Sequence, residues 1–324
     1  MRKLLPSFAA ILALTASDAL AQDTRPLDEK GTFTLLIEND ALYDADRDYT
    51  NGLRLAWQSG ENVPSWIRWI GDQLPFFPIG SRRRYGLAVG QSIFTPEDES
   101  RRDLIVDDRP YAGWLYGAVS LTADTGRTLD NYELQVGVIG PKAQGEWVQN
   151  NVHRAIGSHE SRGWDNQLDN EIGAVLYYER RWRGLLEVTP NTLGIDLTPH
   201  AGFALGNVYT FAAAGAAFRF GWDLPSDYGP PRVRPSLPGT DFFNPTAGFG
   251  WYLFAGAEGR AVARDIFLDG NTFTDSHSVD RKHDQESDAE HPSQNPEHLS
   301  VPPYQTWQQS NGAVLRQVPR AHNR

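Results

Sequence analysis

Apolar and polar residues alternate along repeated segments of the chain from Gly31 onward. Alternation with a period of two puts successive side chains on opposite faces of a sheet, so each segment is predicted to be a β-strand. About ten segments are recognisable, each about ten residues long, as in strands that cross a membrane. They cover residues 31–39, 52–59, 85–94, 111–122, 131–140, 171–182, 196–205, 210–222, 248–261 and 266–280.

The third segment illustrates the two faces of the predicted sheet. Its large apolar set is predicted to face outward and consists of Tyr85, Leu87, Val89 and Ile93. Its small set suits a crowded interior and consists of Gly86, Ala88, Gly90 and Ser92. With 30 glycines, 10 tryptophans, 12 tyrosines and 15 phenylalanines, the composition fits soluble sandwiches and also membrane barrels, whose aromatic residues gather at the interfaces.

Two short helices are predicted between the strands. A proline-rich loop holds a helical turn near Trp66–Gly71. Residues 145–157 fit about three helical turns, because apolar residues recur there with helical spacing. Gln149 and His153 share another side of this helix, and Gly157 is predicted to end it. The apolar side consists of Val148, Val152 and Ile156.

The two ends of the chain differ from the alternating region. Residues 1–21 begin with two positive charges, continue with a short apolar run and close with small residues, which is the pattern of a secretory signal peptide. A strand-rich domain is predicted over residues 22–281. Residues 282–324 are poor in apolar residues and are predicted to form a disordered tail. No later stretch approaches the ~18 apolar residues of a membrane-spanning helix.

Composition narrows the class of protein further. An exported chain without cysteine cannot rely on disulfides, so its stability has to come from its hydrogen-bonded architecture or a large core. The formal net charge of −11 argues against nucleic acid as a partner.

A carboxamide, a carboxylate and a hydroxyl gather where the first two predicted strands meet. Asn39 and Asp40 end the first strand and Thr50 precedes the second, so antiparallel pairing puts all three at one rim of the sheet. Asn and Asp side chains also cap ordinary turns, which is the alternative interpretation. Further carboxylates follow in the same loop. Clustered oxygen ligands suit calcium, although their spacing is not that of an EF-hand.

His153 is a candidate general base, because imidazole titrates near neutral pH. A half-exposed surface histidine is the alternative. Glu160 follows a few residues later and offers a carboxylate to a metal. Arg101, in the charged loop after the third strand, is a candidate phosphate ligand, although such charges are more often solvated. The chain has no Gly-x-Ser-x-Gly motif to support a serine nucleophile.

Seven segments, in this order, carry a resemblance to a known family. They are Ile37–Asp40, Asp48–Gly52, Asp108–Trp114, Gly137–Pro141, Gln149–His153, Gly163–Leu168 and Arg260–Asn271. Together they resemble the outer-membrane lipid A 3′-O-deacylase (LpxR) family over about residues 31–281, with a divergent tail after them. The resemblance implies an all-β, antiparallel outer-membrane β-barrel of twelve strands, with the helix near 145–157 at its rim.

The resemblance also implies a function. The family hydrolyses a carboxylic ester to remove the 3′ acyloxyacyl group from lipid A, and the reaction depends on calcium. The expected substrate is therefore lipid A or lipopolysaccharide. The expected location is the Gram-negative outer membrane, and the expected state is a monomer.

Residue by residue, the resemblance places the catalytic group on Asn39, Asp40, Thr50 and His153, with His153 as the general base that activates water. Arg101 stands near the position of a family lysine and is expected to bind substrate. Asp40 and Glu160 are expected to hold Ca²⁺. His159 is the other position that aligns with the family's glutamate, and Glu160 is preferred because a carboxylate suits calcium.

Two other functions remain open at this point. One is a catalytically inactive or truncated outer-membrane barrel with a pore or structural role, which predicts ion conductance and no role for His153. The other is an outer-membrane phospholipase, which predicts a nucleophilic serine and cleavage of glycerophospholipids.

Overall fold

A single antiparallel sheet forms the body of the molecule. The computed structural model describes residues 29–39, 51–157, 159–183, 186–188, 193–224, 250–279 and 304–316. The strands are β1 (Thr32–Asn39), β2 (Asn51–Gln58), β3 (Arg82–Phe94), β4 (Ala112–Asp124), β5 (Thr128–Ile139), β6 (Glu171–Trp182), β7 (Leu186–Val188), β8 (Leu193–Gly206), β9 (Tyr209–Trp222), β10 (Gly250–Asp265) and β11 (Tyr304–Arg316). The predicted signal peptide, 1–21, lies outside the described residues.

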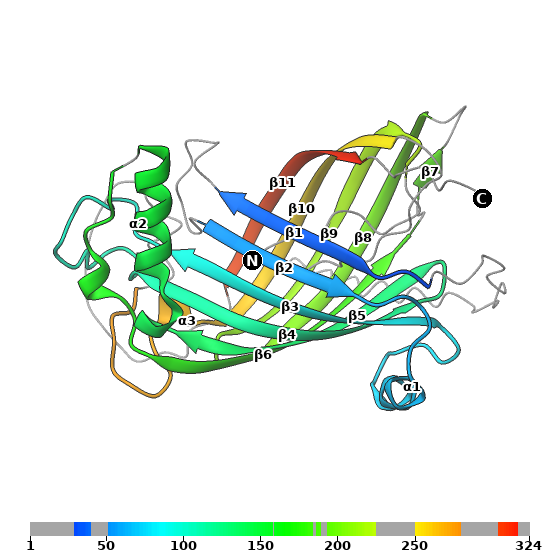
Figure 1. Ribbon diagram of the computed structural model, residues 1–324, viewed down its shortest axis with the longest axis horizontal. Coiled ribbons are helices and arrows are strands. Elements are labelled where there is room, and N and C mark those ends of the chain that lie inside the picture. Colours follow the sequence, from blue (N-terminus) through cyan, green and yellow to red (C-terminus); the bar gives the residue numbers. More distant parts are fainter. Residues whose placement is uncertain are drawn as a thin grey trace, which may run out of the picture.

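Neighbouring strands pair in sequence order from β1 to β11, and the short β7 pairs with β8 where β6 has ended. The sheet curls into a half-barrel (Figure 1). Among the described strands, no pairing joins β1 to β11. The helices are α1 (Ser65–Gln73), the 3-10 turns η2 (Pro141–Ala143) and η3 (Trp164–Asn166), α2 (Gly145–Ile156) and α3 (Ile266–Asp269).

The two ends of the half-barrel carry different helices. We call the end where β1 finishes at Asn39 and β3 finishes at Phe94 the rim end; α2 and α3 lie there (Figure 1). The opposite end, where β2 finishes and β3 begins, carries α1 and is called the far end. No helix in the described part of the chain is long and apolar enough to cross a membrane.

The outer face of the sheet is apolar. Large hydrophobic side chains on alternating positions are exposed on most strands, and these residues define the outward band. They are Phe33, Leu35, Ile37, Leu53, Leu55, Leu87, Val89, Val119, Leu134, Val136, Ile172, Leu176, Leu193, Leu205, Phe218, Phe220, Trp222 and Leu253. A water-soluble protein would turn such residues inward, whereas a barrel in lipid presents them to the hydrocarbon.

The inner face is polar and charged, and its charges are paired. Arg54 donates to both carboxylate oxygens of Glu133, at 3.1 and 2.9 Å, with both side chains buried. Further buried pairs join Arg219 to Asp196 and Arg181 to Glu179, and the His200 imidazole contacts Glu258. Pairing offsets much of the cost of removing these charges from water. The inside-out pattern of polarity therefore confirms the predicted membrane barrel.

Aromatic side chains and α3 fill the interior at the rim end. The Phe267 ring of α3 stacks on Phe94 with ring centroids 3.8 Å apart, and it also contacts Tyr209. These rings belong to a buried cluster with Trp114 and Tyr177. The short helix α3 therefore fills the interior of the barrel at the rim end.

The tenth predicted strand, 266–280, is wrong, because α3 occupies its beginning. Its apolar run, Ile266 to Leu268, resembles a continuation of β10. However, Asp265 caps the turn by accepting a hydrogen bond from the Phe267 N–H at 3.1 Å. Gly270, with φ of 78°, then ends it. The run is buried inside the barrel instead of facing lipid.

The other predicted elements agree with the structure, except in the tail. The nine earlier segments coincide with β1 to β6 and β8 to β10, and both predicted helices are present as α1 and α2. The prediction of a disordered tail does not hold over Tyr304–Arg316, which pair as β11 with β10 from Val262 to Gly250. Backbone pairing along a free strand edge needs no apolar alternation, which explains why the sequence pattern missed this strand.

Replacing Arg54 with leucine is expected to destabilise the barrel by about 3–5 kcal/mol, because the buried Glu133 carboxylate would lose the guanidinium that balances its charge. Urea unfolding of the refolded protein in lipid vesicles measures this loss. The double variant Arg54→Leu, Glu133→Leu is expected to recover most of it, and Leu87→Ala, which removes an outward side chain and no ion pair, serves as the control. A double variant as unstable as the sum of both single variants would contradict the paired-charge account.

Candidate active site

The ends of β1 and β2 meet at the rim. Asn39 pairs with Asn51, and two residues below them Ile37 pairs with Leu53. This confirms that the first two strands bring their ends to one rim. Asp40 and Thr50 lie outside the described residues, so the meeting of their side chains with Asn39 remains a prediction.

Helix α2 lies against the outer side of the wall, next to this rim. Asn51 also pairs with Ile93 of β3. Ile93 is buried in a cluster with Tyr111 and Trp164, against which Val148 of α2 packs. Ile93 therefore belongs to the outward set, as predicted, but it is covered by protein and does not face lipid. Through these contacts the helix that carries His153 lies beside the ends of β1 and β2.

Close backbone approach holds the start of α2 on the wall. A Cβ added to Gly113 of β4 would lie 3.0 Å from the Ala143 Cβ and 3.2 Å from the Gly145 nitrogen. A Cβ on Gly145 would lie 2.7 Å from the Trp164 ring. The Gln91 side-chain amide donates to the Ala143 carbonyl at 2.7 Å. Glycine at both positions therefore lets the helix start seat directly on β4.

His153 lies in the last turn of α2 and is half-buried. Its Nδ1 lies 2.5 Å from the backbone carbonyl oxygen of His159. A carbonyl oxygen only accepts hydrogen bonds, so Nδ1 carries a proton, and in the neutral form of this ring the lone pair is on Nε2. The helix stops at Gly157, as predicted, with φ of 75° and its N–H bonded to the His153 carbonyl. The chain can therefore turn back and supply the His159 carbonyl.

Glu160 lies on the exposed side of this turn. Its carboxylate contacts Arg154 Nε at 3.3 Å, and the two side chains are 54% and 61% exposed. Such an exposed pair contributes little stability, about 0–1 kcal/mol, so the carboxylate can exchange this contact for a cation. Carboxylate oxygens are suitable calcium ligands. Within the described ranges, no group of three or more His, Cys, Asp or Glu side chains is arranged to hold a metal. Asp40, the second expected ligand, lies outside those ranges.

A hydrogen-bond network under α2 was not recognised from the sequence. The Glu99 carboxylate accepts hydrogen bonds from Thr95 at 2.7 Å, from the Gln149 amide at 2.9 Å and from the Ser161 hydroxyl at 2.6 Å. Gln149 in turn accepts from the Trp164 indole at 3.0 Å. Three segments far apart in sequence thus meet at one carboxylate.

This network changes the interpretation of Gln149. The sequence placed it on the same side of the helix as His153, but it is only 1% exposed and its amide is bonded on both sides. It fixes the helix and has no free surface for a substrate. The Tyr111 hydroxyl also donates a hydrogen bond to the backbone carbonyl of Glu99. Burial raises the pKa of Tyr111 above its usual value, so this hydroxyl stays neutral. The Gly163–Leu168 motif, which contains Trp164, is the feature of the sequence that could have indicated this packing.

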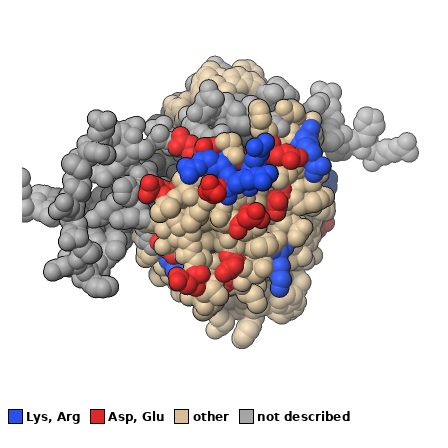
Figure 2. Space-filling view, turned by 90° about the vertical axis from the view of Figure 1, so that its left-hand side faces the viewer, with Lys and Arg blue, Asp and Glu red and all other residues tan. Residues whose placement is uncertain are grey.

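Arg101 lies exposed in the loop between β3 and β4. This loop runs alongside the segment after α2, because the Asn166 side chain donates to the Arg102 carbonyl at 2.7 Å. Nearby, the Ser100 hydroxyl and N–H hold the pKa of Asp98 below its usual value. Figure 2, which views the rim end, shows Lys and Arg side chains in a run bordered by Asp and Glu. The described contacts leave the substrate-binding role of Arg101 a prediction.

Comparisons with known proteins agree with this architecture. The family model described as outer membrane protein LpxR matches residues 7–287. The solved structure "LpxR from Salmonella typhimurium" is similar with a TM-score of 0.59 and 22% sequence identity. The similarity covers 74% of this chain and 77% of that one. None of the curated proteins matches the sequence. Because the family model spans most of the chain and the half-barrel matches the solved fold, this chain belongs to the LpxR family of outer-membrane proteins.

Proposed function

We propose that this chain is an outer-membrane ester hydrolase that removes the 3′ acyloxyacyl group from lipid A. The observation that carries the proposal is the placement of His153. Its ring is held as the Nδ1–H tautomer on a helix seated outside the barrel wall, beside the ends of β1 and β2. A base in that position serves an ester that stays in the membrane.

The outward band supports the choice of a lipid substrate. Ile37 and Leu53, directly below the rim, are 66% and 45% exposed. Trp147 of α2, at the same end of the barrel, is 64% exposed. An acyl chain can therefore remain along the apolar wall while its ester reaches the polar rim.

The proposed chemistry uses His153 Nε2 as the general base. It takes a proton from a water molecule as the water oxygen attacks the ester carbonyl carbon. When the bond to the sugar oxygen breaks, the proton on Nε2 passes to the departing alkoxide. The products are the free acid and the sugar hydroxyl. Asn39 and Thr50 would hydrogen-bond around the carbonyl and orient it.

Calcium belongs to the same proposal. Asp40 and Glu160 would hold the ion, and Arg101 would bind a negatively charged group of the substrate. When bound, Ca²⁺ supplies positive charge that stabilises an oxyanion. The exposed, weakly paired carboxylate of Glu160 is consistent with this role.

The filled interior argues against a pore. Phe94, Phe267 and Tyr209 close the barrel mouth with stacked and tilted rings. Further along the inner face, buried ion pairs such as Arg54 of β2 with Glu133 of β5 occupy the interior. A phospholipase stays as an alternative outcome, to be tested with glycerophospholipid substrates.

His153→Ala is expected to lower the rate of lipid A deacylation by about 10²–10⁴-fold, the usual contribution of a general base. Mass spectrometry of lipid A from cells expressing each variant follows the loss of the acyl group. The matched control is His159→Ala, which keeps the backbone carbonyl that orients His153 and is expected to stay active. Unchanged lipid A with the unsubstituted chain would refute the deacylase, and a fully active His153→Ala variant would refute the base.

Glu160→Gln is expected to raise the calcium concentration needed for half-maximal activity by roughly tenfold or more, equivalent to about 1.4 kcal/mol of binding energy. A calcium titration of the activity of purified protein measures this shift. Glu146→Gln, an exposed acid at the start of the same helix, is the control and should leave the titration unchanged. Equal titration curves for both variants would remove Glu160 from the proposed site.

A further inference from the structure

Helix α1 presents an apolar surface that no described part of the chain covers. Trp66, Trp69 and Ile70 recur at i, i+3 and i+4 and so share one side of the helix. They are 63%, 65% and 40% exposed. The helix docks on the barrel through another side, where Ile67 and Gly71 are buried. Large apolar residues gathered on one exposed side mark an interaction surface.

The orientation of this surface is fixed by contacts on both flanks. Arg83 of β3 pairs with Asp72 at 2.6 Å and donates to the Arg68 carbonyl. The loop after the helix is bonded to β5. The Tyr132 hydroxyl donates to the Pro75 carbonyl at 2.8 Å. These contacts fix the orientation of α1 on the barrel. The fold itself therefore holds the two indole rings of Trp66 and Trp69 outward.

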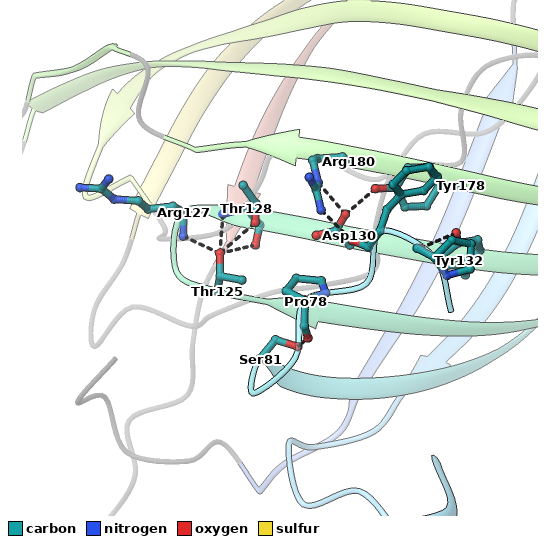
Figure 3. A network of polar contacts seen from close by, with 11 residues as sticks. Pro78, Ser81, Thr125, Arg127, Thr128, Asp130, Tyr132, Tyr178 and Arg180 are labelled. Atoms are coloured by element: carbon teal, nitrogen blue, oxygen red, sulfur yellow. Dashed lines mark hydrogen bonds and ion pairs between the residues drawn. The ribbon is translucent and has the colours of Figure 1, made fainter. Parts of the chain in front are cut away.

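A buried carboxylate completes this frame. Asp130 accepts hydrogen bonds from Tyr178 and from Arg180, both at 2.7 Å (Figure 3). Arg180 then donates to the Phe76 carbonyl at 2.7 Å. The Phe76 ring also lies 5.7 Å from the Tyr178 ring. The loop that follows α1 is thus anchored to β5 and β6 as well as β3.

The exposed side of α1 continues the surface that faces lipid. The helix connects β2 to β3, whose outward residues Leu55 and Leu87 are 50% and 53% exposed. Below them, at the far end, the Trp57 and Tyr85 rings pack edge to face with centroids 5.5 Å apart. Aromatic residues at the end of an apolar band mark the membrane–water interface. In Figure 1, α1 is seen nearly end-on while the strands run across the view, so the helix lies across the strand direction.

We propose that α1 is an interfacial anchor whose Trp66, Trp69 and Ile70 side lies in the phospholipid headgroup region of the leaflet at the far end. A helix that lies across the strands beside the apolar band has the orientation of an in-plane membrane helix. Tryptophan suits this depth, because its ring is apolar and its N–H still finds a polar partner. The anchor fixes the depth of the barrel from the end opposite His153. It does not depend on the proposed enzymatic function.

The absence of native cysteine allows a direct test. Ile70→Cys is labelled with a fluorophore in the full chain, refolded in phospholipid vesicles, and quenched separately by brominated lipid and by aqueous iodide. Leu87→Cys, on the outward band, is the lipid-exposed control. Arg127→Cys, in the exposed turn after β4 at the same end, is the water-exposed control (Figure 3). Heat-dependent gel mobility establishes that each variant is folded.

The label at position 70 is expected to be quenched by brominated lipid to a degree between the two controls, and to be less accessible to iodide than the label at position 127. Adding Trp66→Gln and Trp69→Gln should reduce the lipid quenching, while gel mobility still reports a folded barrel. Quenching like that of the position 127 label would overturn the proposal. Protection from both reagents would also overturn it, because it would mean that a second copy or another protein covers the helix.

Discussion

A sheet that faces hydrocarbon has to satisfy every backbone N–H and C=O within itself, and the rest of this structure follows from that constraint. The antiparallel ladder from β1 to β11 supplies those hydrogen bonds between neighbouring strands, although among the described strands the edges of β1 and β11 are not joined. Its period of two then sends one set of side chains into lipid and encloses the other. Charges in the enclosed set, such as Arg219 with Asp196, have to be matched within the barrel, because little water is available to solvate them. The interior ion pairs are therefore a consequence of the apolar exterior.

The same rigid wall positions the candidate site. Helix α2 lies against the outer side of this wall, where Val148 packs on a buried cluster around Ile93. Close backbone approach and hydrogen bonds also hold it there. Gly113 lets the start of α2 touch β4, and Glu99 bonds to Gln149 within the helix and to Ser161 beyond it. The orientation of His153 then depends on a backbone carbonyl, at His159, whose position this network fixes.

Alternation predicted most of the strands because it follows directly from which side chains face lipid and which face the interior. It failed where another force decided the structure. The run from Ile266 to Leu268 is as apolar as a strand, but it forms α3 and is buried inside the barrel at the rim end. Residues Tyr304–Arg316 show no such alternation in the sequence, although they pair with β10 along its length. For the site, helical spacing predicted α2 and its stop at Gly157. It could not distinguish buried Gln149 from half-exposed His153, because that difference depends on Glu99, distant in sequence.

The packing of α3 at the rim end also bears on where a lipid substrate would bind in the proposed reaction. Phe267 stacks on Phe94 within a buried cluster of aromatic and aliphatic side chains, so protein fills the interior at the rim end. On the outer side, Ile37 and Leu53 form an exposed apolar surface below the ends of β1 and β2. A reaction on a membrane lipid needs an apolar path for the chain and a polar place for the ester. In the proposed reaction the outer side of the wall would supply both, with the apolar band below the rim and His153 on α2 beside it.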